Sequence, residues 1–181
     1  MEVELNALFP DARISRMDTD STRKKGAASN ILKEFASEKT HILVGTQMIT
    51  KGYDFPNVTL VGVVAADLSL GFPDFRAGER TFQLLSQVAG RAGRGDHKGR
   101  VMIQTFNPDH YVIQTAVNHD FNLFFEKEKN IRQQLRYPPF SNLACLKFQG
   151  SDPAKAGAAV RELGRRLREM LKNWPDRKSV V

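Results

Sequence analysis

The chain has 181 residues, of which 41% are hydrophobic and 26% charged, a mixture typical of a soluble globular protein. This length suffices for one domain, or for one domain and part of another. The formal net charge of +7 favours a polyanionic partner such as nucleic acid, and a solvated basic surface accounts for it equally well.

The composition argues against three classes of protein: zinc proteins, disulfide-stabilised proteins and membrane-spanning proteins. The lone Cys145 cannot form an internal disulfide, and no cluster of cysteine and histidine offers a tetrahedral zinc site. Because Cys145 lies in the apolar segment 143–148, we expect a buried structural thiol. The first residues show no basic-then-apolar leader, and no apolar run approaches the roughly 20 residues that span a bilayer. We therefore expect a cytoplasmic protein without a membrane partner.

Apolar runs alternate with segments of helical periodicity over the first 106 residues. In chain order they predict a helix (2–9), a strand (13–17), a helix (about 22–37), two strands (41–46 and 58–66), a loop (68–78), a segment that is helical at first and then interrupted by glycines (79–94), and a strand (99–106). The run 58–66 is apolar on both faces, as a central parallel strand should be. This alternation predicts an α/β fold with a parallel sheet flanked by helices.

The pattern changes after residue 106. Residues 109–136 are predicted to be mostly helical, 141–150 to form a strand, and 152–172 to form a helix capped by Asp152. One strand and one helix are too little for a closed core, so the chain is expected to divide into a domain at 1–118 and a partial α+β domain at 119–181. The apolar stripe of the last helix is expected to face a core; it comprises Val160, Leu163, Leu167, Met170 and Leu171. Four arginines lie elsewhere on this helix, and we expect them to form a solvated surface rather than a nucleic-acid contact; they are Arg161, Arg165, Arg166 and Arg168.

The segment QVAGRAGRG, residues 87–95, is the most informative motif. If a helix runs through it, Gln87, Arg91 and Arg94 lie at i, i+4 and i+7 on one face. Two guanidinium groups one turn apart form a fork for phosphate oxygens, and the glycines between them allow close approach of a ligand. A glycine-rich loop with exposed arginines is the alternative interpretation.

A second motif, GTQMITKGYDFPNV at residues 45–58, follows a predicted strand. Thr46 stands at the carboxyl end of that strand, where ligands bind in open α/β sheets. Gly52 permits close approach of a nucleotide, and Asp54 can accept hydrogen bonds from a ribose. A strand followed by a turn with a capping aspartate is the competing explanation.

These motifs, in this order, resemble the second motor lobe of superfamily-2 DNA helicases. Residues 46–54 align with the motif V of that family, 87–94 with motif VI and 16–22 with the region of motif IV. The longer segments ADLSLGFPDFRAGER, at 66–80, and LRYPPF, at 135–140, resemble the primosomal helicases that restart replication. The resemblance covers nearly the whole chain.

The resemblance implies a RecA-like lobe and a bound ATP with Mg²⁺, held mainly by a first lobe. It implies that Arg91 and Arg94 act as arginine fingers on the γ-phosphoryl group. Nucleotide contacts would come from Gly52, Asp54 and Gln87.

The resemblance also implies contacts with DNA. The candidate residues are Thr46, Gln47, Lys51, Arg16 and Arg76. Phe72 and Phe75 could stack on bases or pack as core under the loop.

Neither a G-x-x-x-x-G-K-[ST] motif nor a Walker B motif occurs in the chain. We therefore expect that this chain alone neither hydrolyses ATP nor unwinds DNA. The zinc module of the resembling helicases is expected only in a full-length protein, before Met1. Branched forks, single-stranded DNA, single-stranded DNA-binding protein and primosome proteins are the partners that the resemblance implies.

Two other functions compete with this interpretation. One is a non-catalytic module that binds DNA or a protein and uses the glycine- and arginine-rich segment 87–95 to bind phosphate. The other is the second lobe of another superfamily-2 helicase, such as the RecG type.

Overall fold

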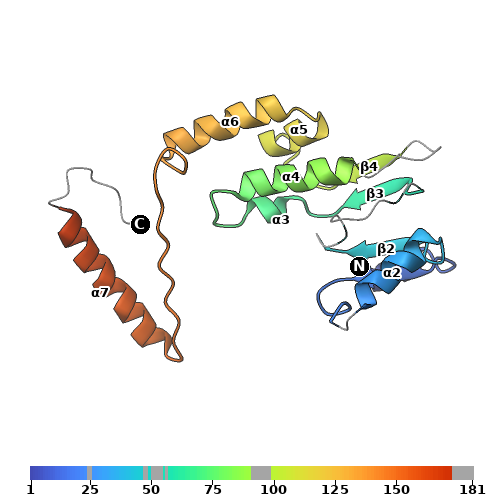
Figure 1. The fold of residues 1–181 in the computed structure, drawn as a ribbon, viewed down its shortest axis with the longest axis horizontal. Helices are drawn as coiled ribbons and strands as arrows, with labels where there is room; N and C mark the ends of the chain where they lie inside the picture. The colour runs from blue at the N-terminus through green and yellow to red at the C-terminus, as the bar shows by residue number, and fades with distance from the viewer. Residues whose placement is uncertain (24–25, 47–48, 50–54, 56, 91–98, 173–181) are drawn as a thin grey trace. The chain divides into compact units, whose positions relative to one another are not determined.

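The computed structural model describes residues 1–23, 26–46, 49, 55, 57–90 and 99–172. The chain divides into two compact units, Met1–Phe140 and Ser141–Val181. Figure 1 shows the helices and strands of both units. Within the described ranges, no helix has the length and apolar character that a membrane crossing requires.

The first parallel strand pair follows a short helix, α1 (Glu2–Leu8). Strands β1 (Ile14–Met17) and β2 (Ile42–Gly45) pair in parallel, and the helix α2 (Ala27–Ala36) connects them. Leu32 on α2 is 2% exposed, so the predicted amphipathic helix does bury its apolar face. The predicted strands at 13–17 and 41–46 are confirmed.

Helix α2 begins at Ala27, later than the residue 22 that the sequence predicted. The Ser21 and Thr22 side chains are used in a turn instead: each hydroxyl donates a hydrogen bond to the carbonyl oxygen of Asp18. Gly26, directly before the helix, has a φ of 88°, which an L-residue adopts only with strain.

A second parallel pair consists of β3 (Leu60–Val63) and β4 (Arg100–Ile103), with α3 (Asp67–Leu70) and α4 (Ala77–Ala89) between them in the sequence. Both strands are confirmed. The expectation that 58–66 is buried on both faces is wrong, because Leu60 is 56% exposed. In the described residues only the face that carries Val63 and Ile103 packs against the core.

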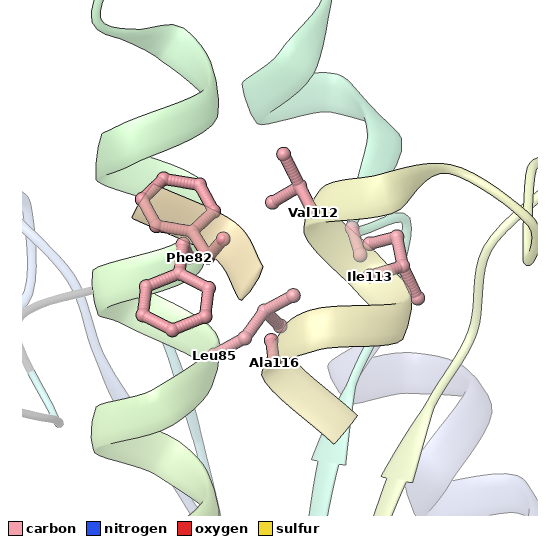
Figure 2. Close-up of a cluster of buried hydrophobic side chains, with 7 residues drawn as sticks. Phe82, Leu85, Val112, Ile113 and Ala116 are labelled. Atoms are coloured by element: carbon pink, nitrogen blue, oxygen red, sulfur yellow. The ribbon is translucent and has the colours of Figure 1, made fainter. Parts of the chain in front are cut away.

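The core of the first unit forms where α4 meets α5 (Tyr111–Val117) and α6 (Phe121–Gln134). Figure 2 shows Phe82 and Leu85 of α4 facing Val112 and Ala116 of α5, and Ile113 of α5 belongs to the same buried cluster. The ring of Phe124 on α6 stacks on Phe82 with centroids 4.0 Å apart. The cluster also contains Ala66.

Because Phe124 belongs to this core, the compact unit extends through α6 to Phe140. The boundary predicted between 118 and 119 does not coincide with this division, because it would separate α6 from the helices that bury its apolar face. Helix α6 begins just after this point, and its N-cap residue Asp120 accepts a hydrogen bond from the backbone N–H of Leu123 at 2.9 Å.

The second unit contains helix α7 (Pro153–Leu171). The predicted cap is confirmed, since the Asp152 carboxylate accepts hydrogen bonds from the backbone N–H groups of Ala154 and Lys155 at 2.9 and 3.2 Å. The predicted core under α7 is not formed by the described residues: Val160 is 48% exposed, and Met170 is exposed as well. Ion pairs with glutamates of the same helix engage Arg165 and Arg166.

Residues 141–150 form no strand, contrary to the prediction. A strand is stabilised by hydrogen bonds to a neighbour, and no segment among the described residues pairs with this one. Cys145 is exposed rather than buried for the same reason, because no sheet forms here for its segment to pack in.

Replacing Phe124 by alanine should lower the free energy of unfolding of the first unit by about 3–5 kcal/mol, because it empties a ring-sized volume in the core. Phe125→Ala, one residue along α6 and half exposed, is the matched control and should cost less than about 1 kcal/mol. Urea denaturation followed by circular dichroism measures both. Equal effects would show that α6 does not pack with α4 and α5.

Candidate nucleotide and nucleic-acid site

Strands β1 and β2 end side by side. In their parallel register Arg16 pairs with Val44 and Met17 with Gly45, so Asp18 and Thr46 follow at the same edge. A side chain at Gly45 would collide with the backbone oxygen of Met17, so glycine is needed for this close approach. Thr46 is exposed there, at the carboxyl ends of parallel strands, where ligands bind in α/β folds.

Arg16 forms an ion pair with Asp18 at this edge. Its Nε donates to the Asp18 carboxylate at 2.6 Å, and its Nη2 contacts the same oxygen. The backbone N–H of Ser21 donates to the other Asp18 oxygen at 2.8 Å. Together these donors, the Ser21 N–H first, lower the pKa of Asp18 to about 2. A DNA phosphate at Arg16 would therefore compete with a carboxylate that already holds the guanidinium.

A second basic position lies at the start of α4, where Arg76 is the N-cap residue. The Asp74 carboxylate accepts a hydrogen bond from the Arg76 backbone N–H at 2.9 Å, and this bond, followed by the Arg76 side chain, holds the pKa of Asp74 below its usual value. The same carboxylate pairs with the guanidinium groups of Arg76 and Arg80 at 3.3 and 2.9 Å. Two cations therefore share one anion at this turn.

The exposed face of α4 forms a polar stripe opposite its buried face. Its members stand at i, i+4, i+7 and i+11, which places them within one narrow sector of the helix. They are Arg76, Arg80, Gln83 and Gln87. Analysis of the sequence missed Arg80, although its position opposite the apolar residues of α4 was a signal that could have found it.

Several predicted site residues lie outside the described residues: Gln47, Lys51, Gly52, Asp54, Arg91 and Arg94. Helix α4 ends at Ala89, with Gly90 as its C-cap residue, inside the segment 79–94 that the sequence predicted to be helical at first and then interrupted by glycines. The helical spacing that joined Gln87 to Arg91 and Arg94 is therefore supported only as far as Gln87. Among the predicted residues, the structure describes Arg16 and Thr46 at one sheet edge, and Arg76 and Gln87 on one helix.

The two phenylalanines predicted as a stacking patch have different surroundings. Phe72 is 67% exposed and lines an open apolar hollow with Leu68 and Phe106. Phe75 instead packs against Tyr137, with ring centroids 5.8 Å apart, and lies under the guanidinium of Arg132. Phe72 thus remains available to a ligand, whereas Phe75 belongs to the packing under the loop.

Residues 3–96 of this chain match the family described as "Helicase conserved C-terminal domain". The matched range is more than half of the chain and includes every predicted nucleotide and DNA residue from Arg16 to Arg94. The chain therefore belongs to the helicase C-terminal domain family, in which a RecA-like second lobe is the structural unit.

Within this class the chain is similar to replication restart proteins. It is 48% identical over 168 residues to the replication restart protein PriA of Bacillus subtilis (strain 168), covering 93% of this chain and 21% of that protein. To the PriA of Synechocystis sp. it is 44% identical over 163 residues, 90% of this chain and 20% of the relative. To the PriA of Rickettsia conorii it is 44% identical over 165 residues, which cover 91% of this chain and 26% of that relative. The predicted resemblance to replication-restart helicases is confirmed, and the chain spans about a fifth of the length of the first two relatives.

The Asp18 ion pair predicts a pH dependence. Folding lowers the pKa of the Asp18 carboxyl. Its contribution to stability is therefore present above the unfolded pKa of about 3.8 and is lost as the pH falls towards 2. The wild type should therefore have a higher Tm than Asp18→Asn above pH 4, and this difference should shrink between pH 4 and 2. Thermal unfolding followed at several pH values measures it. A Tm difference that stays constant from pH 5 to pH 2 would contradict the assignment.

Proposed function

We propose that this chain is the second motor lobe of an ATP-dependent DNA helicase that acts in replication restart. The observation that carries the proposal is the family match over residues 3–96, which contains both sequence motifs predicted to bind nucleotide. The similarity to proteins named for replication restart narrows the class. With α6 packed on α4 and α5, we propose that this lobe extends through residue 140.

In the proposed ATP site, Arg91 and Arg94 neutralise the charge that develops on the γ-phosphoryl group. Gln87, exposed on α4 four residues before Arg91, positions these arginines, and Gly52 and Asp54 contact the nucleotide. ATP with Mg²⁺ supplies the energy-yielding phosphoryl transfer. The phosphate cradle and the magnesium ligands belong to a first lobe, because the chain carries neither Walker motif.

The proposed DNA contacts are electrostatic and directed at the phosphate backbone. They come from Arg16, Thr46, Gln47, Lys51 and Arg76. The exposure of Thr46 at a sheet edge and of Arg76 on the polar stripe of α4 supports two of these roles. We add Arg80 to this set, because it shares the Asp74 carboxylate with Arg76 and lies on the same helix face.

For the whole protein we propose binding to branched forks and single-stranded DNA, with single-stranded DNA-binding protein and primosome proteins as partners in the cytoplasm. A zinc module would belong to the full-length protein, outside this chain. The support is the similarity to relatives that carry the name replication restart protein.

In a protein that carries both lobes, Arg91→Ala and Arg94→Ala should each lower the ATP turnover number by about 10³–10⁵, because an arginine finger stabilises charge that appears in the transition state. Affinity for single-stranded DNA should stay nearly unchanged. DNA-stimulated phosphate release and fluorescence anisotropy measure the two quantities.

Arg168→Ala, an exposed arginine on α7, is the matched control, and the isolated 181-residue chain should release no phosphate above background. If Arg91→Ala and Arg94→Ala abolish DNA binding and flatten its salt dependence while turnover is kept, the chain is a non-catalytic phosphate clamp. Phosphate release by the isolated chain would contradict the proposal that the ATP site needs a first lobe.

A further inference from the structure

Phe75 connects an exposed arginine with a buried one. The guanidinium carbon of Arg76 lies 5.3 Å from the centroid of the Phe75 ring, and that of Arg132 lies 5.2 Å from it. Both distances are within the range of a cation–π interaction. The Arg76 side chain is 50% exposed, whereas that of Arg132 is 14% exposed. One guanidinium is open to solvent, and the other is fixed inside the unit.

Arg132 is held by two carboxylates from different helices. Its Nη2 donates to Glu79 on α4 at 2.8 Å, and its Nε donates to Glu128 on α6 at 2.8 Å. Hydrogen bonds between charged groups are about twice as strong as neutral ones, and two of them fix the plane of a guanidinium. Since Arg132 and Glu128 are both largely buried, movement of the Arg132 head group would leave the Glu128 carboxylate without its cation in a dry environment, whereas Glu79 is partly exposed to solvent.

Tyr111 on α5 completes this cluster. Its hydroxyl donates to the second Glu128 oxygen at 2.5 Å. Burial, followed by the hydrogen bond to Glu128, raises the pKa of Tyr111, so the phenol stays protonated and remains a donor. We call Glu79, Tyr111, Glu128 and Arg132 the Arg132 cluster. It joins α4, α5 and α6, and its guanidinium lies over Phe75.

We infer that Arg132 is a positioning residue for the contact that Arg76 makes with the DNA backbone. Arg132 fixes the Phe75 ring, and the ring, together with Asp74, limits the orientations open to the Arg76 guanidinium. Fewer orientations mean less conformational entropy lost when a phosphate binds. This inference rests on the proposed function, because it takes Arg76 as a DNA contact.

Lysine in place of Arg132 separates positioning from charge. It keeps the positive charge beside Glu79 and Glu128, but it has neither the planar fork that binds two carboxylates nor the flat face that lies on the Phe75 ring. A triple variant, Glu79→Gln with Glu128→Gln and Arg132→Met, removes the cation without leaving buried charges. Such neutral replacements of buried ion pairs are commonly tolerated by the fold.

The test is a double-mutant cycle on DNA affinity with the 181-residue chain. Arg76→Met, Arg132→Lys and the combined variant are titrated against fluorescein-labelled oligothymidylate at about 50 to 200 mM salt. Arg76→Met should weaken binding roughly five- to tenfold at low salt and reduce the salt slope by about 0.7. Arg132→Lys should weaken binding at least about twofold in the wild-type background and have almost no effect when Arg76 is absent. The triple variant removes two negative charges and one positive charge, so it is judged by its coupling to Arg76→Met, which should match the coupling of Arg132→Lys.

The controls separate this role from a loss of stability. Arg168→Lys makes the same exchange on the exposed face of α7 and should leave affinity unchanged. Thermal unfolding identifies the temperature at which every variant is fully folded, and the titrations are made there. If Arg132→Lys fails this criterion, the triple variant replaces it in the cycle.

The outcomes distinguish the inference from the proposed function. If Arg76→Met leaves affinity unchanged, the DNA contact at Arg76 fails, and the inference fails with it. If Arg76→Met weakens binding but changes at Arg132 do not, only the inference is overturned. Equal losses from Arg132→Lys with and without Arg76 would also overturn it, because Arg132 would then act independently of Arg76.

Discussion

Burial of one face of α4 is the constraint on which the remaining arrangement depends. Phe82 and Leu85 are almost inaccessible to solvent and pack against α5 and α6, as Figure 2 shows. Burying each of these side chains stabilises the fold by about 1.5–3 kcal/mol. With that face fixed, the opposite face of the helix is fixed as well. The stripe from Arg76 to Gln87 is therefore a consequence of core packing and not of any attraction between its polar side chains.

Ion pairs then hold the charged side chains whose positions core packing determines. A net charge of +7 could have been spread as unpaired cations, but many of the described arginines are held by nearby carboxylates. Asp74 holds Arg76 and Arg80, and Asp18 holds Arg16. In each of these pairs the arginine side chain is about half exposed, so a phosphate can reach the guanidinium although a carboxylate already binds it. The Arg132–Glu128 pair differs, because both side chains are largely buried and breaking the pair leaves charges in a dry environment.

Much of the fold was predictable from the sequence, because short apolar runs and helical periodicity report on local structure. This is why the sequence correctly predicted strands β1 to β4 and the Asp152 cap. The failures concern partners distant in the chain. Segment 141–150 has the composition of a strand but no neighbour to pair with among the described residues. Arg132 and Glu79 are separated by 53 positions, so no local pattern announces their contact. The family resemblance predicted Arg76, whereas the ion pair of Arg80 with Asp74 became visible only in the structure.

The central claim is that the exposed face of α4 is where this lobe meets its nucleic acid. Nuclear magnetic resonance tests it most directly: the arginine Nε–H and glutamine amide signals of the chain are followed during titration with a single-stranded oligonucleotide. The account predicts that the side-chain signals of Arg76, Arg80 and Gln83 shift, together with those of Arg16. Shifts confined to the arginines of α7, with the α4 signals unmoved, would contradict it.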